Sequence, residues 1–317
     1  MWVAFVRTQG APVSETAHVP VMLEEVVSML RPRSGGLYCD ATLGAGGHAE
    51  RVLELSAPDG RLVGIDRDPE ALERARRRLR PFGERVRLLH GSYADAARLL
   101  GELGCVPVDG FLLDLGLSSD QLEGAGRGFA LRRSGPLDMR FDQTRPGTAA
   151  DLLRCLDVDD LARLLAEWGE QPAATRIARA IRGEVDAGRL DTTADLAAVV
   201  ARAAPPARGR RTHPATRVFQ ALRIAVNDEL GALTAFLRGF HELLRPGGRI
   251  VVIAFHSLED RLVKQRMREL SGRSQGPVLA LLTRRPLRPS DAERRANPRA
   301  RSARLRAAER IDPEARA

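Results

Sequence analysis

Between residues 37 and 115 the chain alternates short apolar runs with amphipathic stretches, and this alternation limits the possible folds more than any other feature. The stretch over 69–79 has helical periodicity and begins with Pro69 directly after a capping Asp68. The apolar runs have the length of strands and lie at 37–42, 61–66, 86–90 and 110–115. Strands that alternate with helices at this spacing predict an α/β fold with a parallel, doubly wound, Rossmann-like sheet.

A helical block interrupts this pattern. From about 149 to 204 the sequence has helical periods and no convincing strand. Strand character returns at 249–255, after one long predicted helix over 216–244. We therefore predict an N-terminal extension, a discontinuous α/β domain and an inserted all-helical, substrate-side domain, which cover residues 1–17, 18–123 with 211–317, and 124–210 respectively.

Composition excludes several classes of protein. No apolar run approaches the roughly 18 residues that span a bilayer, and residues 1–16 lack the apolar segment of a secretory signal. The three cysteines are widely spaced and form no Cys-x-x-Cys pair, which argues against a disulfide framework and a structural zinc site. We expect a cytoplasmic protein with no metal and no membrane partner. The sequence leaves monomer and homodimer open.

The basic residues point to nucleic acid only where they cluster. The formal net charge is +9, but all basic residues except Lys264 are arginine, a skew that is partly explained by GC-rich coding. Ten arginines against three acidic residues lie in 284–310, where we favour phosphate contact over a solvated tail. Alternation around Leu305 predicts an edge strand in this tail, and we expect the tail to lie apart from the glycines near residue 46.

A glycine-rich loop follows the first predicted strand. It contains Gly44, Gly46 and Gly47, and Asp66 ends the next strand 20 residues beyond Gly46. Glycines let the backbone turn sharply and approach a ligand closely, and a carboxylate at this spacing accepts hydrogen bonds from ribose hydroxyls. The pattern indicates a nucleotide-like cofactor over a plain glycine turn, and by itself it leaves NAD and S-adenosylmethionine open.

Ten sequence blocks together carry a resemblance to one family. They are HVPV at 18–21, DATLGAGGH at 40–48, IDRDP at 65–69, DLGLSSDQL at 114–122, RGF at 127–129, GPLDMR at 135–140, HPATR at 213–217, FQALRI at 219–224, FHSLEDR at 255–261 and NPRARSA at 297–303. Their order and content make the chain resemble the ribosomal RNA small subunit methyltransferase H family, also called the MraW family. The resemblance extends from about residue 18 to residue 310.

The resemblance implies a class I S-adenosylmethionine-dependent methyltransferase with a helical domain inserted after the fourth strand. The implied reaction methylates N4 of a cytidine in 16S rRNA, so the implied partner is the small ribosomal subunit. This chain has Tyr93 where the family usually has Phe, and an aromatic ring is kept. The implied cofactor-binding residues are Gly46, Gly47, His48, Asp66, Tyr93, Asp114 and Gln121.

Asp114 and His256 are the candidate catalytic residues. Asp114 follows the fourth strand, but the next residues, 115–117, are not the Asp-Pro-Pro-Tyr type of many exocyclic-amine DNA methyltransferases. His256 stands beside Ser257 and Glu259, which equally resemble a helix N-terminus with capping groups. Rival functions are a DNA or other RNA amine methyltransferase, a non-catalytic ribosome-assembly factor and an NAD-dependent oxidoreductase.

The candidate substrate-binding residues each have a structural alternative. Hydroxyl groups in a turn can cap it, arginines near Asp138 can form internal ion pairs, and a loop histidine can merely orient its loop. The candidates are Ser118, Ser119, Arg127, Arg140, His213, Arg217, Arg299 and Arg301.

Overall fold

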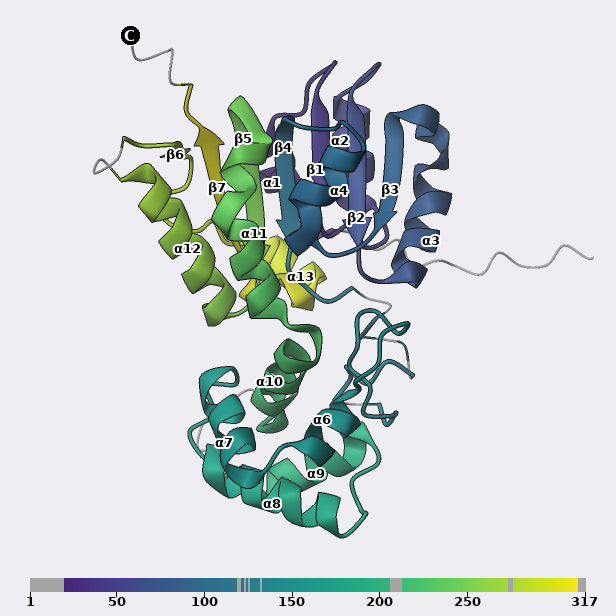
Figure 1. The fold of residues 1–317 in the computed structure, drawn as a ribbon, viewed down its shortest axis with the longest axis vertical. Coiled ribbons are helices and arrows are strands. Elements are labelled where there is room, and N and C mark those ends of the chain that lie inside the picture. The colour runs from purple at the N-terminus through teal and green to yellow at the C-terminus, as the bar shows by residue number, and fades with distance from the viewer. Residues whose placement is uncertain are drawn as a thin grey trace, which may run out of the picture.

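A seven-stranded sheet forms the centre of the α/β part (Figure 1). Its order is β3-β2-β1-β4-β5-β7-β6, in which β1 to β5 are parallel and β7 is antiparallel to both of its neighbours. This arrangement confirms the predicted Rossmann-like sheet. The strands are β1 Leu37–Asp40, β2 Arg61–Asp66, β3 Val86–His90, β4 Val108–Asp114, β5 Leu244–Ala254, β6 Leu279–Leu281 and β7 Arg304–Arg310.

These elements belong to a computed structural model. The predicted N-terminal extension and the candidate Ser119 lie outside the residues that it describes. The described residues are 20–118, 121–122, 124, 126–131, 133–205, 213–272 and 276–312.

Helices cover both faces of the sheet. On one face Leu53 and Leu72 pack with Leu112, and on the other Phe240 and Val263 belong to a separate apolar cluster. α3 begins where predicted, because the Asp68 side chain accepts a hydrogen bond from the Glu70 amide. The first face carries α1 Leu23–Leu30, α2 Gly47–Leu55 and α3 Pro69–Leu79, and the second carries α4 Ala96–Glu102, α11 Glu229–Leu243 and α12 Ser257–Ser271.

Helices α6 to α10 build a third core beyond the carboxyl ends of the parallel strands (Figure 1). Leu161, Ile177 and Leu196 are fully buried in it, together with Val218 and Leu222 of α10. Because α10 belongs to this core, the helical packing extends past the predicted domain boundary at residue 210. The helices are α6 Ala149–Cys155, α7 Val158–Glu167, α8 Ala174–Asp186, α9 Thr193–Ala203 and α10 Ala215–Asn227.

Two predicted elements are wrong in detail. The single helix expected over 216–244 is two helices, because Asp228 adopts a left-handed conformation (φ 48°) between α10 and α11. The expected edge strand near Leu305 is β7, which is an inner strand because β6 pairs with its outer side.

Among the described helices, none is long and apolar enough to cross a bilayer. The remaining elements are α13 Asp291–Ala296 and the short 3-10 helices Arg80–Arg85, Tyr93–Asp95 and Pro298–Ser302.

Candidate active site

The glycine loop between β1 and α2 turns back against the ends of two neighbouring strands. Gly44 and Gly46 have φ angles of 55° and 81°, which L side chains rarely adopt. A Cβ atom on Gly47 would lie 2.5 Å from the Pro20 Cγ. The Gly44 amide donates to Asp66 Oδ2 at 2.7 Å, so the carboxylate that ends β2 fixes the loop. The loop therefore requires glycine for its conformation and for close packing.

Three carboxyl groups gather where β1, β2 and β4 end. The pKa of Asp40 is raised to about 8, mainly by burial and also by the nearby Asp114 and Asp66, against one hydrogen bond from the Thr42 amide that lowers it. Burial also raises the pKa of Asp66, whose Oδ1 accepts from the Asp68 amide at 2.8 Å. Asp66 and Asp114 thus place acidic side chains around the buried Asp40 carboxyl group. This end of the sheet therefore favours a cationic ligand.

Two contiguous hollows lie over these strand ends. Of the residues proposed for the cofactor, the strand-end hollow is lined by Asp66, Tyr93, Asp114 and Gln121. The second, which we call the glycine-loop hollow, is lined by Gly47, His48 and Arg299, and it shares Thr42, Gly44, Asp114, Gly116 and Ser118 with the first. The fold thus brings six of the seven predicted cofactor residues to one place. Gly46 lines neither hollow and instead shapes the turn before α2.

Tyr93 forms a flat side of the strand-end hollow. Its ring meets Phe236 edge-on at 6.1 Å between centroids, and the Arg67 guanidinium carbon lies 5.6 Å from its centroid. Its hydroxyl donates to the Glu229 carbonyl at 3.4 Å, and burial raises the pKa of the phenol. A held aromatic ring beside Leu233 suits the face of a planar ligand group.

His48 reaches the same region from the first turn of α2. Burial lowers its pKa to about 4, so the ring is neutral at pH 7. Its Nε2 lies 3.0 Å from the Val21 carbonyl oxygen, which assigns the ring proton to Nε2. Nδ1 is then an acceptor 3.9 Å from Asp114 Oδ2. Two acceptors at this separation suit a ligand that brings its own donor, such as an ammonium group.

A buried polar network ties the strand-end hollow to the helical block. Asp68 Oδ2 accepts from Gln121 Nε2 at 3.2 Å and from Arg127 Nη2 at 2.9 Å. Arg127 also donates to the carbonyls of Arg140 and Phe141. Only 8% of the Arg127 side chain is exposed. Of the two interpretations of Arg127, the geometry therefore favours an internal anchor over RNA contact.

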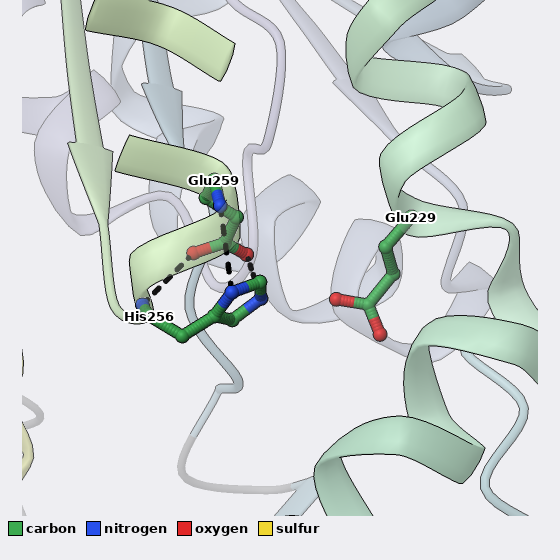
Figure 2. Close-up of side chains that lie close together, drawn as sticks. All are labelled: Glu229, His256 and Glu259. Carbon is green, nitrogen blue, oxygen red and sulfur yellow. Dashed lines mark hydrogen bonds and ion pairs between the residues drawn. The ribbon is translucent and has the colours of Figure 1, made fainter. Parts of the chain in front are cut away.

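Glu229, His256 and Glu259 converge at the junction of α11, β5 and α12 (Figure 2). Both glutamates line the strand-end hollow. His256 is the N-cap of α12, and Glu259 closes a capping box with it, as the capping interpretation predicted. His256 Nε2 lies 3.0 Å from Glu259 Oε1, and the atom makes no well-aligned hydrogen bond.

These three side chains have the donor set of a cation site, since one ligand atom of each lies within 4.8 Å of the others. However, Arg223 donates to both Glu229 oxygens, at 2.8 and 2.9 Å. Glu259 Oε2 accepts from the Phe255 and His256 amides. Most of the acceptor capacity of the carboxylates is therefore used within the protein, and the cluster is better described as a hydrogen-bonded junction.

Most other substrate candidates make internal contacts. Arg140 forms a double hydrogen bond with Asp138, at 2.8 and 2.7 Å. The Ser118 hydroxyl accepts from the Gln121 amide, and His213 Nδ1 accepts from the Ala215 amide, as turn-capping groups do. Arg217 donates to the Glu170 carbonyl at 2.6 Å. None of these contacts excludes a substrate role, but each gives the side chain a structural role within the protein.

The arginine-rich tail divides into two parts. Arg304 and Arg306 both pair with Asp260 of α12, at 3.4 and 2.6 Å. Arg301 is exposed, whereas Arg299 lines the glycine-loop hollow beside Gly47. The expectation that the tail lies apart from the glycines is therefore wrong, because β7 enters the sheet next to β5 and returns the tail to the strand ends.

Several residues of the site were missed at the sequence level. Glu229 and Leu233 belong to α11, and their spacing resembles that of any amphipathic helix. Arg67 lies in the IDRDP block between Asp66 and Asp68, and only the two aspartates match a motif with a predicted role. Only the proximity of α11 to the strand ends, a tertiary feature, identifies Glu229 and Leu233.

Comparison with known proteins gives a consistent set of relatives. The model of the MraW methylase family matches residues 15–311. A ribosomal RNA small subunit methyltransferase H from Thermomicrobium roseum is 52% identical over 313 residues, which cover 95% of this chain and 96% of the relative. One from Geobacter sulfurreducens is 51% identical over 314 residues, with 93% and 99% covered. Among solved structures, an rRNA methylase from Streptococcus thermophilus has a TM-score of 0.41 at 11% identity, with 92% and 94% covered.

Proposed function

The chain belongs to the MraW methylase family, and we propose on this premise that it transfers a methyl group from S-adenosylmethionine to N4 of a cytidine in 16S rRNA of the small ribosomal subunit. The observation that carries the proposal is the strand-end hollow, where Asp66, Asp114 and Gln121 meet the glycine loop. The acidic side chains of Asp66 and Asp114 in that hollow match a sulfonium cofactor, because the cofactor carries positive charge.

The residues around the two hollows fit this cofactor. Asp66 is placed to accept hydrogen bonds from ribose hydroxyls, and the Tyr93 ring is placed to flank the adenine. His48 Nδ1 and Asp114 are two acceptors for the ammonium group. Gly46 acts through the turn that it forms, and Gly47 lets the cofactor approach the backbone closely. Gln121 hydrogen-bonds to both Ser118 and Asp68 beside the strand-end hollow. S-Adenosylmethionine, when bound, supplies an activated methyl group, so the protein needs little covalent chemistry.

The remaining task of the protein is to position the amine and remove its proton. The lone pair of N4 is delocalised into the cytosine ring, so an acceptor for its N–H polarises it and takes up developing positive charge. Asp114 ends β4 in the shared wall of both hollows and suits this role. His256 is the second candidate, but its Nδ1 accepts from the Glu259 amide and its Nε2 carries the ring proton beside Glu259, so the geometry favours Asp114 as the acceptor. Closure by the helical block excludes water from the reacting groups.

We assign the substrate side to the helical block. Residues 124–210, extended by α10, overhang the strand ends and form the substrate-side domain, while residues 18–123 and 228–317 form the catalytic domain. Arg299 and Arg301 are the candidate phosphate contacts. Because rRNA is the substrate, the reaction belongs in the cytoplasm, and the enzyme works there as a monomer or a homodimer.

Two alternatives share the fold. A methyltransferase acting on DNA or another RNA would use the same cofactor site, and identities near 50% with rRNA methyltransferases favour rRNA. A non-catalytic assembly factor would have no need for an intact loop, yet the Gly44 amide, Asp66 and Asp68 keep their hydrogen bonds. These features support an active enzyme.

The test is mass spectrometry of nucleosides from 16S rRNA of a strain that lacks the gene. We expect one cytidine to lack an N4-methyl group, and the purified enzyme with S-adenosylmethionine to restore it on the isolated small subunit or its rRNA. An unchanged methylation pattern in the deletion strain would rule out rRNA as the substrate. Methyl transfer to DNA in the same assay would support the DNA alternative.

A further inference from the structure

A third hollow lies where the ends of β4 and β5 face the helical block. We call it the interdomain hollow, and its walls include Leu117 after β4, Phe255 and His256 after β5, and Phe219 and Gln220 of α10. Leu117 and Phe255 also line the glycine-loop hollow, so the two spaces are contiguous. In open α/β sheets, ligands bind beyond the carboxyl ends of the strands. The interdomain hollow is therefore next to the proposed cofactor site, on the β5 side.

Its walls combine flat apolar surfaces from both domains. Phe129 and Phe219 come from the helical side, and Phe255 comes from the sheet. Phe129 stacks on Phe141 with 5.6 Å between centroids, which holds its ring in place. Walls of this kind suit the two faces of a planar ring, because bases taken out of a stack are held between aromatic and apolar side chains.

Polar atoms at one side of the hollow have unused hydrogen-bonding capacity. Gln220 Nε2 donates to the Trp168 carbonyl at 3.0 Å, and among the described residues nothing donates to its Oε1. Arg223 uses Nε and Nη2 on Glu229, and Nη1 donates to no described residue. His256 Nδ1 accepts from the Glu259 amide, which assigns the proton to Nε2, a buried atom that lies 3.0 Å from Glu259 Oε1 without a well-aligned hydrogen bond and can turn its proton to a ligand. The hollow thus presents one acceptor and two donors.

We propose that the interdomain hollow binds the target cytosine, flipped out of the RNA, and that Gln220, Arg223 and His256 read its Watson–Crick edge. Cytosine carries an N–H donor at N4 and acceptors at N3 and O2, which complement one acceptor and two donors. Uracil carries a donor at N3 and an acceptor at O4, so two of the three contacts would be mismatched. The inference rests on the proposed function and extends it from the reaction to the pocket that selects the base.

Flipping follows from the position of this hollow between the two domains. The base must reach between α10 and the β5–α12 junction to meet the methyl donor, which a stacked base cannot do. Unstacking costs a few kcal/mol, which contact with the three phenylalanines offsets. Leu117 and Phe255 mark the opening through which N4 would face the glycine-loop hollow.

Photo-crosslinking tests the pocket directly. The full-length enzyme is irradiated with 16S rRNA that carries 5-iodocytidine at the methylated position, and the crosslinked peptide is sequenced. We expect the crosslink at Phe129, Phe219 or Phe255. A crosslink elsewhere on an enzyme that methylates the unsubstituted rRNA overturns the pocket and leaves the proposed function standing. If the unsubstituted rRNA is not methylated, the proposed function itself fails.

A matched pair of variants tests the reading of the base edge. Gln220→Met keeps the side-chain length and removes the acceptor, while Gln265→Met makes the same change on the exposed face of α12. We expect Gln220→Met to lower kcat/KM for rRNA by about tenfold or more, with S-adenosylmethionine affinity unchanged in titration calorimetry and RNA affinity unchanged, because phosphates dominate it. Gln265→Met should match the wild type. Equal kcat/KM for both variants overturns the role of Gln220, and crosslinking decides if Gln220→Met fails to fold.

Discussion

At the scale of single residues, Asp66 joins the glycine loop to the proposed cofactor site. Its two oxygens accept from the Gly44 and Asp68 amides, so the side chain orders the loop before any ligand arrives. Asp66→Ala should weaken S-adenosylmethionine binding by about 1–3 kcal/mol, the cost of leaving polar groups without partners. Titration calorimetry measures the loss, and an unchanged dissociation constant would remove Asp66 from the cofactor site.

Asp40 predicts a proton release on cofactor binding. With a pKa of about 8 it is mostly protonated at pH 7, and a cation bound nearby lowers that pKa. Binding of S-adenosylmethionine at pH 7 should release up to about one proton, and S-adenosylhomocysteine, which lacks the sulfonium charge, should release less. Calorimetry in buffers of different ionisation enthalpy measures the difference. The same release from Asp40→Asn would show that another group titrates.

The same group makes stability depend on pH. The folded-state pKa of Asp40 is raised, so its contribution to stability is present below its unfolded pKa near 3.8 and is lost as pH rises through about 8. Asp40→Asn keeps the acceptor for the Thr42 amide and cannot ionise. The variant should therefore gain in free energy of unfolding relative to the wild type between pH 4 and pH 8, by urea denaturation. A constant difference across this window would contradict the assignment.

Residue roles were predictable where a motif implied a local geometry. Asp68 as a helix cap and the helix N-terminus around Ser257 and Glu259 follow from spacing within a few residues, and Asp66 near Gly44 follows from two strands that end at the same edge of the sheet. Contacts between distant segments were not predictable. Arg299 beside Gly47, or Arg223 with Glu229 near His256, depends on how whole elements pack.

At the scale of elements, the start of α3 anchors the segment that leads into the helical block. Asp68 is 1% exposed and accepts hydrogen bonds from the side chains of both Gln121 and Arg127. Arg127→Ala leaves that carboxylate buried without its charge partner, which should cost about 3–5 kcal/mol in unfolding free energy. Cofactor affinity should fall as well, because Gln121 shares the same oxygen.

Arg76→Ala is the matched control for this prediction. Arg76 pairs with Glu73 on the same helix, but both side chains are more than half exposed. Exposed pairs contribute about 0–1 kcal/mol. Chemical denaturation that shows equal losses for the two arginine variants would refute the anchoring role of Arg127.

The element boundaries show where sequence periodicity stops being informative. The period of 3.6 residues continues across Asp228, so 216–244 read as one helix, while a left-handed residue redirects the chain. The alternation of residues at β7 predicted a strand there, but it did not predict which strands would pair with it. Its outer neighbour, β6, has only three residues, and a strand this short leaves little signal in the sequence. Element types were mostly predictable, and their packing was not.

At the scale of the whole molecule, the effect of the net charge of +9 depends on where the arginines lie. Arg304 and Arg306 both pair with Asp260, so their charge is partly neutralised within the fold. Arg299 and Arg301 precede β7, and Arg299 lines the glycine-loop hollow. If these two contact phosphates, positive charge from the tail, the cofactor and the target base meet at one end of the sheet.

Salt dependence of RNA binding tests this arrangement. Replacing Arg299 and Arg301 with Gln should flatten the slope of log affinity against log salt by about 0.7–0.9 for each lost phosphate contact. A control with Arg51→Gln and Arg98→Gln removes the same charge from exposed pairs with Glu54 and Glu102 and should leave the slope nearly unchanged. Arg299→Gln alone should also alter S-adenosylmethionine affinity, because it lines the glycine-loop hollow, whereas Arg301→Gln alone should not. Equal slopes for the two double variants, each with a native circular dichroism spectrum, would assign the tail arginines to composition and leave RNA recognition to the interdomain hollow and the helical block.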